Sequence, residues 1–247
     1  MCSVGTTDPW NAAGIGLDLW ALSECGVRAV SVVAGVSAQD ESGVHALAAM
    51  APGLIEAQFS ALAALPIAAY RVGALLAAAS VAAVAAAVRL RPAPLVLDPV
   101  LAPSGGGSFA GSDTIGALVR ELIPLATLVT PNLAEGARLT GLEVRSVAEM
   151  SVAAARLAAA GAGAVLVKGG HLAERPIDVL YADGAIETLA AERLPGTLRG
   201  TGCLLACAAA AELAKGATLR DAVVRARAFV RAKLANAHEL GSMRVAY

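Results

Sequence analysis

The residues best suited to chemistry on an anion lie near the end of the chain. Gly200, Thr201, Gly202 and Cys203 lead directly into an apolar segment, 204–214, that predicts a helix. Glycines on either side of a threonine expose backbone N–H groups at the helix start, and these donors suit tetrahedral oxygens such as those of a phosphate. The same field predicts a lowered pKa for the Cys203 thiol. Glycine also begins many helices for packing alone, so the motif needs support from elsewhere.

Three oxygen-bearing side chains follow predicted strands. Asp98 ends an apolar run and precedes a proline, where a carboxylate could hold Mg²⁺ directly or through water, or simply cap a turn. Asn132 and Glu135 lie three residues apart on a short predicted helix and therefore share a face. They could order metal-bound water, or Asn132 could only cap the helix beside a solvated Glu135.

Other candidates for ligand contact stand alone. Lys168 ends the apolar run 165–167 and precedes Gly169 and Gly170, so it could reach a nucleotide phosphate while the glycines permit close backbone approach; the alternative is a lysine at a sheet edge. Asp18 interrupts an apolar helix, and a carboxylate there needs a partner or a ligand. Gln39 follows a strand expected to end near Val36, where its amide could contact a heterocycle or only solvent. The glycine-rich stretch 104–107 could be a flap or a flexible connection.

Short β-branched runs alternate with alanine-rich runs along the whole chain. Strands are expected at 27–36, 69–74, 95–100, 127–130 and 164–168, with helices between them at 52–65, up to about 90, at 113–123 and at 132–139. Asp183-Gly184 predicts a hairpin between strands 178–182 and 185–189. A capping box beginning at Ser146 opens a further helix, and Thr218 opens the last one. This pattern is typical of a mostly parallel sheet with helices on both faces. Because ligands bind beyond the carboxyl ends of such strands, the candidate residues should converge at one edge.

Composition narrows the function. The 247 residues are 57% hydrophobic with a net charge of −1, so no nucleic-acid partner or polybasic membrane contact is expected. The most apolar segment, 74–88, is shorter than a membrane span needs. No basic or apolar leader is visible, and the four cysteines lack C-x-x-C spacing, which favours a reducing cytoplasm. No linker or repeat is visible, so we expect a single domain over residues 1–247.

Taken together, the motifs resemble the hydroxymethylpyrimidine/phosphomethylpyrimidine kinases of thiamine biosynthesis, a branch of the ribokinase-like superfamily. The segments that carry the resemblance follow the family's order and spacing: 7–9 (TDP), 13–19 (AGIGLDL), 38–39 (AQ), 98–100 (DPV), 130–135 (TPNLAE), 167–172 (VKGGHL) and 200–203 (GTGC). Cys203 separates this branch from sugar kinases, which carry an aspartate there.

The resemblance implies a three-layer α/β/α ribokinase-like fold, usually a homodimer, that uses ATP and Mg²⁺ to phosphorylate 4-amino-5-hydroxymethyl-2-methylpyrimidine and then its monophosphate. The implied sites are an anion hole and catalytic position at Gly200, Thr201, Gly202 and Cys203, substrate contacts at Asp18, Gln39, Thr7 and Val100, ATP contacts at Lys168, Asn132 and Gly170, and metal contacts at Asp98 and Glu135.

The chain departs from the family at several positions. Ser-Gly-Gly is replaced by residues 10–12 (WNA), a glycine by Thr6, a methionine beside the pyrimidine by Ala74, a flap lysine by Pro103, and a histidine by Arg199. These changes bear on the substrate more than on the fold. Two alternatives therefore stay open: another vitamin-precursor kinase of the pyridoxal type, or a weakly active sensor that binds a pyrimidine or nucleotide.

Overall fold

The computed structural model describes residues 1–102, 109–170, 172–173 and 175–247. Within these ranges, nine strands form one sheet in the order β3-β2-β1-β4-β5-β6-β7-β8-β9. Strands β2, β1, β4, β5, β6 and β7 run parallel, whereas β3, β8 and β9 pair antiparallel with their neighbours. The mostly parallel sheet predicted from the sequence is thus confirmed. The glycine-rich stretch 104–107, together with Pro103, lies outside the described residues.

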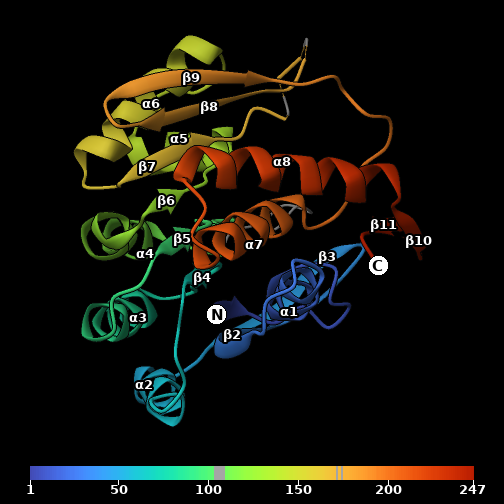
Figure 1. Ribbon diagram of the computed structural model, residues 1–247. Helices are drawn as coiled ribbons and strands as arrows, with labels where there is room; N and C mark the ends of the chain where they lie inside the picture. The colour runs from blue at the N-terminus through green and yellow to red at the C-terminus, as the bar shows by residue number, and fades with distance from the viewer. Residues whose placement is uncertain (103–108, 171, 174) are drawn as a thin grey trace.

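Helices cover both faces of this sheet (Figure 1). One face carries α1 (Gly14–Glu24), α7 (Thr201–Ala214) and α8 (Leu219–Ala235), whose alanine and leucine side chains pack into a single apolar cluster. The other face carries α2 (Pro52–Ala61), α3 (Ala78–Leu90), α4 (Ser112–Ala117), α5 (Leu133–Thr140) and α6 (Val147–Ala159), which pack over a second cluster. The sheet is therefore the middle of three layers, as predicted.

The strands are β1 (Cys2–Thr6), β2 (Val30–Asp40), β3 (Gly43–Ala49), β4 (Tyr70–Val72), β5 (Leu95–Leu97), β6 (Leu128–Val129), β7 (Ala164–Val167), β8 (Ile177–Ala182) and β9 (Ala185–Ala190). Buried residues fill the central strands, because helices cover them on both sides. A separate hairpin, β10 (His238–Leu240) and β11 (Met243–Val245), closes the chain.

Local capping signals predicted several boundaries correctly. Asn132 and Ser146 both form complete capping boxes, and Gly141 ends α5 in the left-handed conformation. Asp183 and Gly184 both have positive φ, as the tight turn between β8 and β9 requires. These signals act within a few residues, so the sequence displays them directly.

Two predicted segments were wrong. The strand expected to end near Val36 instead continues as β2 to Asp40 and pairs with β3 as an antiparallel hairpin. Here the usual alternation is inverted, because Ser37 and Gln39 point inward whereas Val36 and Ala38 are exposed. The expected helix 113–123 ends as α4 at Ala117 and continues as a π turn, Leu118–Leu122, followed by a 3₁₀ turn, Ile123–Leu125, that contains a proline.

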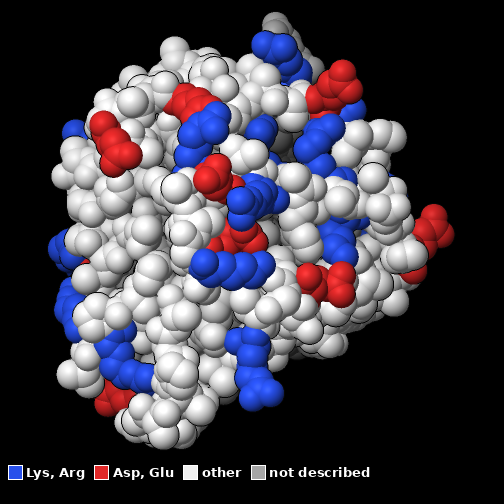
Figure 2. All heavy atoms as spheres, in the orientation of Figure 1, with Lys and Arg blue, Asp and Glu red and all other residues white. Residues whose placement is uncertain are grey.

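Within the described residues, no helix is both long enough and apolar enough to cross a membrane. Basic and acidic side chains alternate over the face in Figure 2 rather than gathering into a patch of one sign. Several basic side chains of the described residues form ion pairs, for example Arg220 with Glu187 and Arg225 with Glu212. This face offers no field that would attract a polyanion.

Candidate active site

The first turn of α7 lies against the ends of the central strands. Gly200 begins the helix with a φ of +79°, and a Cβ there would lie 2.4 Å from the Ala12 carbonyl oxygen, so only glycine fits. No side chain of the described residues caps this helix, so the amides of its first turn remain available to a ligand. The backbone of this turn therefore has the conformation expected of the helix start, and the anion hole itself stays a prediction.

Two side chains from the sheet meet this turn. A Cβ built on Gly202 would lie 3.1 Å from Lys168 Nζ and 3.5 Å from Asp98 Oδ2. Lys168 follows β7 and Asp98 follows β5, so both project from the carboxyl ends of parallel strands. The structure thus brings together the lysine, the aspartate and the glycine-rich turn, three features separated by at least 30 residues in sequence.

Asp98 is buried among donors. Its Oδ1 accepts from Lys168 Nζ at 2.8 Å and from Thr130 Oγ1 at 3.3 Å, while its Oδ2 accepts from Arg71 Nη2 at 3.1 Å. Burial disfavours the carboxylate, but Lys168 and Arg71 outweigh that cost and lower the pKa of Asp98. The negative charge at this position is therefore fixed by two cations.

Glu135 closes the other side of Lys168. Its Oε2 accepts a hydrogen bond from the backbone N–H of Asn132 at 2.7 Å and lies 4.0 Å from Lys168 Nζ. Burial raises the pKa of Glu135 to about 7, against the influence of Lys168. Asn132 is the N-cap of α5, and its side-chain oxygen accepts a hydrogen bond from the backbone N–H of Glu135. The capping interpretation of Asn132 is thus confirmed, whereas Glu135 is buried rather than solvated.

Lys168 keeps its charge in this setting. Burial works against the ammonium, yet the carboxylates of Asp98 and Glu135 outweigh it and raise the pKa of Lys168. The side chain remains 17% exposed, so a ligand can reach it. Gly170 follows two residues later, where nothing lies within 4 Å of a built Cβ, in keeping with close approach of a ligand to the backbone. His171 lies outside the described residues.

Arg71 is the residue that sequence reasoning missed. It sits in β4, is only 1% exposed, and joins Asp18 Oδ2 at 2.7 Å to Asp98 Oδ2 at 3.1 Å. Burial opposes its charge, but Asp18 and the neighbouring groups outweigh it and raise its pKa. The signal in the sequence was an arginine inside an otherwise apolar run, and such a residue does not reveal its partners.

Asp18, for which a substrate contact is predicted, has its hydrogen-bond partners inside the protein. Its carboxylate is fully buried and accepts hydrogen bonds from Ser3 Oγ at 2.7 Å, Arg71 Nη1 at 2.7 Å and Cys207 Sγ at 3.3 Å. Burial raises its pKa above the ordinary value. The partner that this carboxylate needs is thus inside the protein, and no open edge of Asp18 faces a ligand.

The cysteine on the same turn behaves differently from expectation. Burial raises the pKa of the Cys203 thiol to about 11, and the lowering influence of Arg71 does not offset it. The prediction of a lowered pKa was wrong, because desolvation inside the apolar cluster outweighs the field of the helix. Cys207, one turn later, is a fully buried core residue, as expected, and both thiols are free.

The remaining expected substrate contacts lie at the edge formed by β1 and β2. Thr7 follows β1, and its carbonyl accepts the hydroxyl of Ser37. Gln39 is buried and its amide oxygen accepts from Arg199 Nη2 at 3.2 Å. Val100 follows β5 two residues beyond Asp98, and its amide donates to the Asp98 carbonyl. All three stand at the carboxyl ends of strands, on the side where α7 begins.

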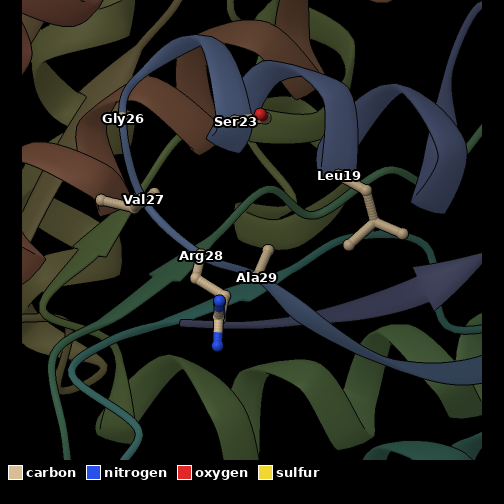
Figure 3. Close-up of a pocket in the computed structure, with 6 residues that line it drawn as sticks. All are labelled: Leu19, Ser23, Gly26, Val27, Arg28 and Ala29. Carbon is tan, nitrogen blue, oxygen red and sulfur yellow. The ribbon is translucent and has the colours of Figure 1, made fainter.

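A surface depression lies beside the amino end of β2, away from the candidate site (Figure 3). It is lined by Leu19, Ser23, Gly26, Val27, Arg28 and Ala29, from the end of α1 and the turn before β2. The residues there include a single charged group, and none of the candidate residues reaches it. It has no part in the site at the carboxyl ends.

The three-layer α/β/α fold, with Lys168 and Asp98 beside the first turn of α7, is that of the small-molecule kinases of the ribokinase-like class. The model of the phosphomethylpyrimidine kinase family matches residues 8–246, and the chain belongs to that family. It is 38% identical to the hydroxymethylpyrimidine/phosphomethylpyrimidine kinase of Rhizobium meliloti (strain 1021), over 96% of this chain and 91% of the relative.

Solved structures agree with this placement. The phosphomethylpyrimidine kinase of Clostridium difficile 630 superposes with a TM-score of 0.83 at 26% identity, covering 94% of this chain and 97% of that one. An ADP complex of Bacillus subtilis pyridoxal kinase superposes with a TM-score of 0.91 at 29% identity, covering 99% and 96%. The chain is thus a kinase whose fold is shared by two kinds of vitamin kinase.

Proposed function

We propose that this protein transfers the γ-phosphoryl group of ATP to 4-amino-5-hydroxymethyl-2-methylpyrimidine and to its monophosphate, as the names of its relatives suggest. The observation that carries the proposal is the convergence of the glycine turn, Lys168 and Asp98 at one edge of the sheet. Use of ATP is supported by the structural similarity to a kinase solved with ADP.

The proposed roles of the residues differ with their charge. The amides of Thr201 and Gly202 donate to the oxygens of the transferring group, where charge develops, and such preorganised donors supply the largest single contribution in reactions of this kind. Lys168 lies beside them and neutralises the nucleotide phosphates. Asp98 holds Lys168 in place through an ion pair, and Arg71 holds Asp98 through a second, buried ion pair.

The donor set also fits a magnesium ion. Mg²⁺ commonly takes one or two protein carboxylates and completes its shell with water and phosphate oxygens. Asp98 and Glu135 supply two carboxylates on either side of Lys168 Nζ, although the described residues contain no group of three metal-binding side chains. When bound, the ion would neutralise phosphate charge, and Asp98 and Glu135 would hold it.

Cys203 acts as a neutral group in this proposal. With its pKa raised to about 11, the thiol stays protonated at neutral pH and does not take a proton from the acceptor. The Gly14 amide donates to its sulfur, so the side chain links α7 to the start of α1. Its proposed role is to position the acceptor side of the turn.

A coupled assay of ADP release tests the proposal. The purified chain is given ATP with the pyrimidine alcohol, its monophosphate or pyridoxal. Turnover with either pyrimidine supports the proposal. Turnover with pyridoxal alone favours the pyridoxal-type alternative, for which the close superposition on the Bacillus subtilis enzyme is the supporting observation. Binding without ADP release favours a sensor and contradicts catalysis.

We further propose that residues 1–247 form one kinase domain that works as a cytoplasmic homodimer. The continuous nine-stranded sheet supports a single domain, and the free cysteines support a reducing compartment. For the dimer, β3 is an edge strand that pairs only with β2 among the described strands, and Leu47, Val36 and Leu54 lie exposed on or near it. Sedimentation analysis would give the mass in solution.

A further inference from the structure

A series of contacts joins the last helix to the loop that follows Lys168. Arg227, in the middle of α8, donates from Nε to Asp178 Oδ2 at 2.8 Å and from Nη2 to the Leu189 carbonyl. The other oxygen of Asp178, Oδ1, accepts a hydrogen bond from the backbone N–H of Gly169 at 2.9 Å. The Asp178 carboxylate therefore binds the guanidinium with one oxygen and the loop with the other.

The sheet places Asp178 beside this loop. Val167 of β7 pairs with Val179 of β8 in antiparallel register, so Asp178 stands just beyond the last residue pair of the two strands. It lies on the face of the sheet that α8 covers, because Leu180, two residues later, belongs to the apolar cluster of that face. The side chains of Arg227 and Asp178 are only 16% and 17% exposed, so solvent and salt screen this ion pair little.

The peptide that Asp178 holds is one that could otherwise turn over. It joins Lys168 to Gly169, and a glycine accepts backbone angles of either sign. The Gly169 position admits no other residue, since a built Cβ would lie 1.9 Å from the Ile177 carbonyl oxygen. Because a peptide unit is planar, holding its N–H constrains the path along which the chain leaves Lys168 and reaches Gly170. The Asp178 carboxylate thus holds the backbone that carries both expected ATP contacts.

We propose that Arg227 is a positioning residue for ATP, which acts through Asp178 and the Gly169 peptide without touching the nucleotide. The inference rests on the proposed function, in which this loop contacts the nucleotide. The guanidinium keeps the Asp178 carboxylate turned toward the loop, because a carboxylate without this partner is free to turn toward solvent. The loop keeps one further anchor, since the Gly170 carbonyl accepts from Arg193 Nη1 at 3.1 Å. Loss of Arg227 should therefore weaken ATP binding in part and leave acceptor binding unchanged.

Calorimetry with ATP and magnesium, in the absence of any acceptor, measures the effect. Arg227→Met should raise the dissociation constant for ATP by roughly 3- to 12-fold, the population shift expected when one hydrogen bond no longer holds a binding loop. Arg227→Lys keeps a charged donor for Asp178 and should lose less affinity. Arg231→Met is the matched control, because Arg231 lies one turn later on α8 and donates to the Glu192 carbonyl at 2.8 Å. It should bind ATP as tightly as the wild-type protein.

A double variant separates action through Asp178 from a direct effect of Arg227. If Arg227 acts through this carboxylate, Arg227→Met added to Asp178→Ala should weaken ATP binding no further than Asp178→Ala alone. In turnover, the KM for ATP should rise in Arg227→Met while kcat and the KM for the acceptor stay close to wild type, a split that a general loss of stability does not produce. An unchanged dissociation constant for ATP in Arg227→Met, or additive effects in the double variant, overturns the inference.

Amide hydrogen exchange in the free protein gives a second readout that does not depend on a ligand. The Gly169 N–H should exchange faster in Arg227→Met than in the wild-type protein, and at the wild-type rate in Arg231→Met. Equal exchange of this N–H in Arg227→Met and the wild-type protein also overturns the inference. If the wild-type protein binds no ATP, the proposed function fails, whereas the coupling of Arg227 to the Gly169 peptide is still decided by this measurement.

Discussion

Replacing Arg71 by methionine should destabilise the protein strongly. Arg71 is 1% exposed and is the only cation within 4 Å of Asp18 among the described residues, while Asp98 keeps Lys168. Arg71→Met therefore leaves the Asp18 carboxylate buried with only the Ser3 hydroxyl and the Cys207 thiol as donors. Removing one partner of a buried ion pair costs about 3–5 kcal/mol, which lowers the folding equilibrium constant by roughly two to nearly four orders of magnitude.

Denaturation by urea measures this loss. Arg71→Lys is the matched control. It retains the positive charge, so its loss of stability should be smaller than that of Arg71→Met. Some loss should remain, because a single ammonium replaces a guanidinium that contacts two carboxylates. Adding Asp18→Asn to Arg71→Met should recover part of the stability, since the unpaired buried charge is then removed. A loss below about 1 kcal/mol in Arg71→Met, or no recovery in the double variant, would refute the reasoning.

The pH dependence of the stability loss in Arg71→Met is a second, independent test. Burial raises the pKa of Asp18 above its unfolded value even with Arg71 present, and loss of the arginine raises it further. A carboxyl with a raised folded pKa stabilises the protein fully below its unfolded pKa, and that contribution is lost as the pH rises through the folded pKa. The deficit of Arg71→Met should therefore shrink as the pH is lowered. A deficit that grows on acidification would show that Asp18 is not the group left unpaired.

Two further variants probe the glycine turn itself. Gly202→Ala keeps the backbone N–H but places a Cβ 3.1 Å from Lys168 Nζ and 3.5 Å from Asp98, so it should lower kcat with little change in unfolding. Gly53→Ala, at an open position of α2, should keep wild-type turnover, and equal kcat in both variants would contradict an anion hole at Gly202. Cys203→Ser should leave the shape of the pH–kcat profile between about pH 7 and pH 9 unchanged, because the thiol is protonated throughout; the disappearance of an ionisation in that range would show that Cys203 titrates during turnover.

The sequence by itself determined the features that act locally. The caps at Asn132 and Ser146, the Asp183-Gly184 turn and the glycine start of α7 are each recognised within a few residues, and all are present. The alternation of strand and helix determined the layers, because an apolar strand run can be buried only between helices. Convergence of Asp98 and Lys168 followed from the rule that parallel strands end at one edge.

Only the tertiary structure decided what surrounds each charge. Arg71 meets Asp18 across 53 residues, and Arg199 meets Gln39 across 160, so neither contact leaves a local pattern. The same is true of Cys203, whose pKa rises because α7 is packed into an apolar cluster, although its place at a helix start suggests the opposite. Helix caps and tight turns depend on neighbours in the chain. Desolvation, ion pairing and long-range hydrogen bonds depend on every group within a few ångströms in space, and only the packed fold brings those groups together.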